Sequence, residues 1–209
     1  GINNTSGSKN TFVGDSSGFT NTTGTSNVAI GNNSLKNNLG GLWNVGVGSS
    51  ALESNTSGYS NSGLGIGVLS KNTSGFRNTA SGGGGLQANT TGFENTAAGY
   101  YALHKNTTAS RNVGIGAYAL FNDTTGEKNT ALGHSSAYSL TSGSNNLFLG
   151  VYSGINCTTS SNNVFAGAET GTNNTTGGNN TFIGFQSGLS NTTASNNTMI
   201  GVQSGYLNT

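Results

Sequence analysis

A 17-residue repeat runs through the chain without insertion or deletion. Asn returns at every seventeenth residue from Asn10 to Asn197, and Gly follows four residues after each Asn, from Gly14 to Gly201. Eleven full units lie between nine leading and thirteen trailing residues. A fixed short period is typical of repeat proteins, in which each unit packs on its neighbours. We number the repeat positions 1 to 17 from the Asn, and coil 1 begins at Asn10.

The length and composition of one unit predict strands rather than helices. Seventeen residues are too few for a two-helix repeat, which needs about 33 or more. The 209 residues include 36 Gly, 33 Asn and no Pro, a composition that favours turns and short strands. One unit has room for two or three short strands joined by tight turns. We therefore predict an all-β fold, a parallel β-solenoid or β-roll with one coil per repeat, about 12 coils and a single domain over residues 1–209.

Stacked coils place like residues in files along the solenoid. Asn side chains can hydrogen-bond to their own kind above and below, so the Asn file predicts a structural ladder. A Gly at every coil predicts a corner that needs a positive φ or leaves no room for a Cβ. The ladder and corner residues include Asn27, Asn44, Asn61, Asn78, Asn95 and Asn112, with Gly31, Gly48, Gly65, Gly82, Gly99 and Gly116.

The strand at positions 1 to 5 carries apolar residues on both of its faces. Position 4, as in Ile30 and Ile115, predicts an inward core file, which turns position 3 outward. Position 3 is never polar, and soluble monomers rarely expose a long apolar stripe. We therefore expect position 3 to bury against other chains in a side-by-side homotrimer, or else a dimer. The alternative is a wide single-chain core at a kink. The candidate interface residues are Phe12, Phe148, Phe165 and Phe182.

A second strand is expected around the N-T-T sequence at positions 12 to 14. Thr favours strands, and the Gly that follows favours a turn. These residues predict an outward file of hydroxyl and amide groups, which suits contacts with neutral glycans. The candidate outward face is represented by Asn89, Thr91, Asn106 and Thr108.

Charge and hydropathy exclude several classes of function. Seven basic and six acidic side chains leave a net charge of +1, so no electrostatic footprint for nucleic acid exists. The sequence has no apolar run of membrane-spanning length and no signal peptide at its start, so we expect no membrane insertion. The single cysteine, Cys157, cannot form an internal disulfide and predicts a buried or tolerated thiol.

Short motifs of enzymes and metal sites occur in the wrong context. The segment Gly14–Gly18 matches G-x-S-x-G with Ser16 as nucleophile, but it lies inside a repeat and not between a strand and a helix. The glycine run Gly82–Gly85 lacks a Walker lysine. Asp15 and Asp123 occupy different repeat positions, which excludes a periodic calcium site. We expect no enzymatic activity, no cofactor and no metal.

Histidines and aromatic residues leave two further alternatives. His104 and His134, two coils apart, predict solvated side chains rather than metal ligands. An aromatic strip could stack on sugar rings, and its alternative is corner packing or a subunit contact. The strip consists of Trp43, Tyr59, Phe76 and Phe93.

Whole repeats resemble a known family. NTAAGYYALHKNTTASRN (95–112), NVGIGAYALFNDTTGEKN (112–129) and NTFIGFQSGLSNTTASNN (180–197) are similar to the N-T-A-x-G-x-x-A-L-x-x-N-T-T-G-x-x arrays of bacterial and phage proteins described as tail-fibre-domain-containing. NVAIG (27–31) and NVGIG (112–116) also resemble the S-V-A-I-G motif of trimeric autotransporter adhesin heads. The resemblance implies an elongated homotrimeric fibre, extracellular, at a cell surface or on a virion tail. It assigns no catalytic residue.

Two functions follow as expectations. The first is a structural fibre or adhesin, a rigid rod that spaces or presents a receptor-binding or glycan-binding surface. Its partners would be copies of itself, as a homotrimer or filament, and cell-surface glycans. The alternative is an ice-binding solenoid, because files of Thr and Asn can order water, and N-x-[small/apolar]-x-G resembles the N-x-V-x-G repeat of grass ice-binding β-rolls. Neither end has an obvious polar cap, which predicts a piece of a longer chain or an end-to-end filament.

Overall fold

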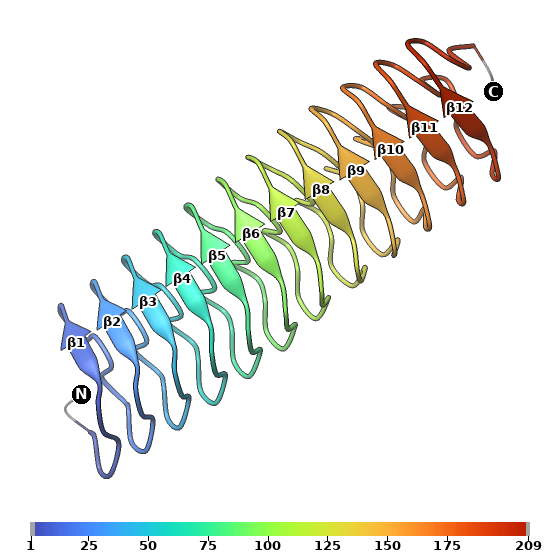
Figure 1. Ribbon diagram of the computed structural model, residues 1–209. Helices are drawn as coiled ribbons and strands as arrows, with labels where there is room; N and C mark the ends of the chain where they lie inside the picture. The colour runs from blue at the N-terminus through green and yellow to red at the C-terminus, as the bar shows by residue number, and fades with distance from the viewer. Residues whose placement is uncertain (1–2, 208–209) are drawn as a thin grey trace.

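The chain forms an all-β parallel β-solenoid with one strand per repeat. The computed structural model describes residues 3–207 and shows a rod of successive coils, with the chain advancing from one end to the other (Figure 1). Twelve three-residue strands form one sheet in the order of the sequence, each parallel to the next. The strands are β1 Thr11–Val13, β2 Val28–Ile30, β3 Val45–Val47, β4 Ser62–Leu64, β5 Thr79–Ser81, β6 Thr96–Ala98, β7 Val113–Ile115, β8 Thr130–Leu132, β9 Leu147–Leu149, β10 Val164–Ala166, β11 Thr181–Ile183 and β12 Thr198–Ile200. The predicted fold class is confirmed.

The register of the sheet follows the 17-residue period. In the pair β6 and β7, Thr96 lies opposite Val113 and Ala98 lies opposite Ile115. Every other neighbouring pair has the same offset, so each repeat position forms one file along the rod. Successive coils therefore rise by about one strand spacing, roughly 4.8 Å.

Glycine at position 5 turns the chain where each strand ends. Gly116 has φ 125°, and a Cβ there would lie 2.6 Å from the carbonyl carbon and oxygen of Gly133 in the next coil. Both a positive φ and the absence of a Cβ are required, as predicted. Three further left-handed positions, 7, 9 and 17, carry larger side chains. In coil 6 these are Tyr101, Leu103 and Arg111, with φ of 55°, 52° and 63°.

The two faces of the strand are the reverse of those predicted. Position 3 points into the core, where Ala29 is fully buried, and position 4 points outward, where Leu64 is 57% exposed. The Asn at position 1 is itself buried, as at Asn61, and alternation along a strand places position 3 on the same side. The prediction that position 4 forms the core is therefore wrong.

The phenylalanines expected at a subunit interface belong to the core of their own chain. Phe148, Phe165 and Phe182 are fully buried, and Phe12 is half-buried against the same core. The interface prediction for these four residues is wrong, and the alternative of a single-chain core at position 3 is the observed one. The apolar character of position 3 alone could not show whether it faces the core or a partner, because the polar Asn residues of position 1 also lie inside the rod.

Two columns of the core exchange volume from coil to coil. Where position 9 is Leu, as in coil 6 with Leu103, position 3 is Ala or Gly, here Ala97. Where position 9 is Gly, position 3 is Phe or Met, and its side chain fills the space that the glycine leaves. The large-side-chain coils pair Phe12 with Gly18, Phe148 with Gly154, Phe165 with Gly171, Phe182 with Gly188 and Met199 with Gly205. Each of these coils thus supplies one large apolar side chain to a close-packed core.

Coil 8 lies between the leucine coils and the phenylalanine coils and follows neither pattern. Ala131 at position 3 and Ala137 at position 9 are both small and fully buried. Leu140 replaces the usual Asn at position 12 and is also fully buried in the core. In this coil the large apolar side chain therefore comes from position 12 and not from position 3 or 9. The substitution removes one Asn from the file at position 12.

Candidate functional site

The Asn file at position 1 is a continuous buried hydrogen-bond ladder. Asn61 Nδ2 donates to Asn44 Oδ1 at 3.1 Å and to the Gly75 carbonyl at 2.8 Å. Asn61 Oδ1 accepts from the backbone N–H of Asn78 at 3.0 Å and from its Nδ2 at 3.1 Å. Each amide is thus satisfied by the coils above and below. The predicted ladder is confirmed, and its role is structural.

A second Asn ladder occupies position 12, which corrects half of the predicted outward face. Asn89 and Asn106 are fully buried, and Asn89 Nδ2 donates to Asn72 Oδ1 at 2.7 Å. Thr91 and Thr108, at position 14, are exposed as predicted. The described residues at positions 12 to 14 form a bend rather than a strand, so the second strand expected here is not observed. In a strand, positions 12 and 14 would share a face, whereas the bend turns position 12 inward and position 14 outward.

The intervening threonines at position 13 use their hydroxyl groups within the rod. Thr90 Oγ1 donates to the carbonyl of Thr107 in the next coil at 3.0 Å, and Thr107 Oγ1 donates to the carbonyl of Thr124 at 3.1 Å. These side chains are half-buried. Of the threonine files at positions 13 and 14, only the second therefore presents free hydroxyl groups to an external ligand.

Asp123 interrupts the second ladder with a buried carboxyl group. It stands at position 12, is fully buried, and accepts a hydrogen bond from the Gly126 N–H through Oδ1 at 2.9 Å. Asp123 Oδ2 and Asn106 Oδ1, in adjacent coils, both lack a hydrogen-bond partner among the described residues. Burial raises the pKa of Asp123 to about 8, and hydrogen bonds from Gly126 and Asn129 oppose that rise. A proton on Oδ2 would give it a donor for the Asn106 oxygen. The carboxylic acid would then stand in for the amide of an Asn.

The outer face of the sheet is an uncharged stripe built from positions 2 and 4. No position-2 or position-4 residue in any coil carries a charge. Position 4 is aliphatic in most coils and is exposed or half-buried along the rod, with 55% of Val13 and 66% of Ile200 exposed. Position 2 is Thr, Ser or an aliphatic residue. The stripe exposes apolar side chains on every part of the sheet and is the candidate surface for contact with a partner.

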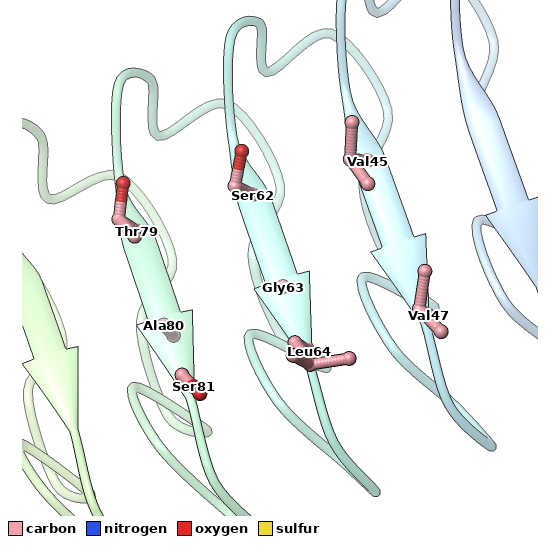
Figure 2. A pocket seen from close by; sticks show the side chains of 8 residues that line it. All are labelled: Val45, Val47, Ser62, Gly63, Leu64, Thr79, Ala80 and Ser81. Carbon is pink, nitrogen blue, oxygen red and sulfur yellow. The ribbon is translucent and has the colours of Figure 1, made fainter.

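A shallow groove of about 350 Å³ crosses this stripe over β3, β4 and β5. Figure 2 shows Val45 and Val47 on β3, Leu64 on β4 and Ser81 on β5 along the same face. Ser81 occupies a position that is aliphatic in the preceding coils, so the groove lies where the file of large side chains is interrupted.

The aromatic strip predicted at the position-16 corner packs upon itself. Tyr59, Phe76 and Phe93 stack with ring centroids 4.9 and 4.8 Å apart and planes within 4° of parallel. Arg77 lies 5.7 Å from the centroid of Phe76, and Arg111 lies 5.3 Å from that of Phe93. Because the rings stack face to face, both faces of Phe76 and the inner faces of Tyr59 and Phe93 are not available to a sugar ring. Corner packing is the interpretation that the geometry supports.

Ion pairs connect the residues beside this strip. Glu94 lies between Arg77 at 3.0 Å and Arg111 at 3.2 Å, in the coils below and above. Hydrogen bonds from Arg111 and Arg77 lower the pKa of Glu94. Trp43 occupies the same repeat position as these three residues, position 17, in coil 2, and 59% of it is exposed. These charges stack along the rod and form no concave site.

The two histidines join a second aromatic cluster. His104 Nδ1 lies 3.0 Å from the carbonyl oxygen of Gly84, and its ring stacks on Phe121 at 5.2 Å. His104 is half-buried between these contacts, so its side chain is solvated only in part. His134 is exposed, as predicted, and its ring meets that of Tyr152 edge to face at 5.5 Å.

The remaining candidate groups lie apart. Ser16 Oγ is 3.3 Å from Asp15 Oδ2 in coil 1, and His104 is five coils away, about 24 Å along the rod. Cys157 is buried, and burial raises the pKa of its thiol to about 11.

Residues 3–207 contain no cluster of three His, Cys, Asp or Glu side chains that could hold a metal ion. The same range contains no helix long and apolar enough to cross a membrane.

Comparisons of the chain with protein-family models, with curated proteins and with solved structures find no match.

Proposed function

We propose that the chain is a segment of a structural fibre or adhesin, which associates side by side with copies of itself through the outer sheet face. The rod is extracellular, at a cell surface or on a virion tail, and it spaces or presents a surface that binds a receptor or glycan. The resemblance of its repeats to tail-fibre arrays supports this assignment. The proposal gives the chain no catalytic role.

The observation that carries the proposal is the stripe of positions 2 and 4, which carries no charged residue in any of the twelve strands. Exposed aliphatic residues such as Ile30, Ile115 and Ile183 recur along the rod. A second copy has the same 17-residue pitch, so its side chains meet the stripe in register over the whole length. Burial of this surface removes apolar area from water without burying a charge.

The size of the stripe suits association between two or three copies. Three residues span roughly 10 Å and twelve strands about 55 Å, so one copy offers about 500 Å² and a pair buries about 1,000 Å². That area is at the lower limit for a specific interface. Three copies around one axis form a closed assembly and use the stripe most fully, which favours the homotrimer.

Light scattering of the purified protein tests self-association. We expect a mass close to three times the 20.9 kDa chain. The double variant Leu64→Lys and Ile115→Lys places charges on exposed position-4 residues and should give monomers, because the interface would bury unpaired ammonium groups. Thr91→Lys and Thr108→Lys, at exposed residues outside the stripe, form the matched control. A wild-type protein that is monomeric at high micromolar concentration would contradict the proposal.

Ice binding is the second candidate, and the exposed threonine file at position 14 favours it. Thr91, Thr108 and Thr125 are exposed in three successive coils, with one hydroxyl and one methyl group about every 4.8 Å. Thermal hysteresis and inhibition of ice recrystallisation test this candidate. If the file binds ice, Thr91→Lys with Thr108→Lys abolishes the effect, and the Leu64→Lys and Ile115→Lys variant keeps it.

A further inference from the structure

One corner of the rod is hollowed where coil 5 lacks side chains that the other coils carry. Position 6 bears a side chain in every coil except coil 5, where Gly83 occupies it. Two further glycines at position 7, Gly67 in coil 4 and Gly84 in coil 5, also line this corner. The result is a hollow of about 330 Å³ between coils 4 and 6. Its volume is within the range of small-ligand sites, which starts at about 300 Å³.

Aromatic and apolar side chains of the neighbouring coils form the walls. Ile66 in coil 4 is 72% exposed on one side, and Tyr100 in coil 6 is 49% exposed on the other. Tyr100 leans toward the glycines, since a Cβ on Gly83 would lie 3.6 Å from Tyr100 Cδ2. Tyr101 covers Gly84, where its ring would overlap an added Cβ. The amide of Gln87 lines the same hollow.

Packing behind the tyrosines holds them in place. The ring of Tyr101 lies 4.0 Å from that of Tyr100 and 4.4 Å from that of His104, measured between centroids. His104 is fixed in turn by its contact with the Gly84 carbonyl and by stacking on Phe121. The aromatic wall is therefore formed before a ligand arrives, which lowers the entropy cost of binding.

We propose that this hollow binds the ring of an uncharged sugar, as a glycan site on the side of the rod. The residues that line it carry no charge, so a charged ligand would meet no opposite charge there. A sugar ring has apolar C–H faces, which match a tyrosine ring, and hydroxyl groups, which match phenol and amide groups. The inference rests on the proposed adhesin function and names the surface that would contact the glycan. It replaces the Tyr59, Phe76 and Phe93 strip in that role.

The glycine that opens the hollow also permits a direct test. Gly83 has no positive φ, and its added Cβ makes only ordinary contacts, so a side chain fits there as in every other coil. Gly83→Ile should fill the hollow and leave the fold unchanged. Tyr100→Ala removes the aromatic wall without adding bulk. Ala168→Ile introduces the same side chain at position 6 of coil 10, far from the hollow, and is the matched control.

Saturation-transfer NMR measures binding of the full chain to the methyl pyranosides of glucose, galactose, mannose and N-acetylglucosamine at millimolar concentration. We expect transfer to the ring protons of at least one sugar, its loss in Gly83→Ile, and affinity about tenfold weaker in Tyr100→Ala. Ala168→Ile should bind as the wild type does. Absence of transfer from all four sugars, or transfer that persists in Gly83→Ile with a wild-type melting curve, would overturn the proposal. The light-scattering mass of the same samples reports self-association independently, so failure of the sugar site and failure of the fibre assignment are distinguishable.

Discussion

The ring of Phe182 fills the space into which a side chain at Gly188 would project. A Cβ on Gly188 would lie 2.5 Å from both Cδ2 and Cε2 of that ring. In the leucine coils the same space is filled from the opposite side, as by Leu103 above Ala97. The core of the rod therefore has two alternative packings. The large side chain comes either from position 3 in the strand, with Gly at position 9, or from Leu at position 9, with Ala or Gly at position 3.

Exchange of one packing for the other is the first prediction. Phe182→Ala should lower the free energy of unfolding by about 3–5 kcal/mol, because it leaves a cavity. Gly188→Leu should cost about 1–3 kcal/mol through overlap with the ring. The double variant should recover most of both losses, since leucine adopts a φ of 48–55° at this position in six other coils. Chemical denaturation of the four proteins measures the coupling, and simple additivity would contradict exchangeable packing.

The buried Asp123 predicts a stability that falls as the pH rises. The folded chain keeps its proton up to pH about 8, because burial raises the pKa of this carboxyl group, whereas the unfolded chain releases it near the ordinary pKa of 3.8. Between these values the folded state binds more protons, so the free energy of unfolding decreases with pH and levels off above 8. Thermal melts at pH 5, 6, 7 and 8 measure this slope.

Asp123→Asn is the matched variant for that measurement. It restores an amide donor beside Asn106 Oδ1 and should raise the free energy of unfolding by about 1–3 kcal/mol at pH 8. It should also remove the slope between pH 5 and 8. An equal slope in both proteins would show that Asp123 is not the titrating group.

Gly116→Val tests the corner at position 5. Valine is strained at φ 125°, and its Cβ would collide with the backbone of Gly133. We expect a loss of about 3 kcal/mol or more and a Tm lower by roughly 5–10 °C. Ala117→Val adds the same side chain one residue later, at a position without positive φ, and should change Tm little. Equal melts for Gly116→Val and the wild type would refute the corner assignment.

An interior ladder amide should matter more than a terminal one. Asn61→Ala removes bonds to Asn44, Gly75 and Asn78, leaving buried groups unsatisfied at about 1–3 kcal/mol each. Asn197→Ala removes only the bond from Nδ2 to Asn180 Oδ1, at a partly buried site, and keeps the bond from its backbone N–H to the same oxygen. Denaturation midpoints should therefore fall several times further for Asn61→Ala. Similar losses would mean that the ladder does not act cooperatively along the rod.

The repeat period predicted the coil, the parallel sheet and the Gly corner, because these follow from a register that the sequence states directly. The columns of the repeat carry two further signals that single motifs do not reveal. Considered alone, Asp123 is only an isolated acidic residue, but it stands in the same file as Asn89 and Asn106. Likewise, Gly83 is the only glycine at position 6. Both positions are exceptions within their columns, and comparison of the coils in the sequence is enough to identify them.

The inward and outward faces could not be inferred from residue type. Hydrophobicity suggested that Ile30 and Ile115 form the core, whereas both are more than 40% exposed. Burial of an Asn costs little stability when its amide is fully hydrogen-bonded. An aliphatic residue can remain on the surface when other side chains of the coil already fill the core. Each of these conditions depends on residues elsewhere in the coil.

The sequence alone determined the period, and with it the stacking of like residues, since an unbroken step of 17 residues admits one register. Only the tertiary structure decided which side of the strand is the inside. That choice depends on volume and hydrogen bonding summed around a whole coil, as in coil 6, where the core contains Leu103 and the small Ala97 and the buried Asn95 is hydrogen-bonded to its neighbours.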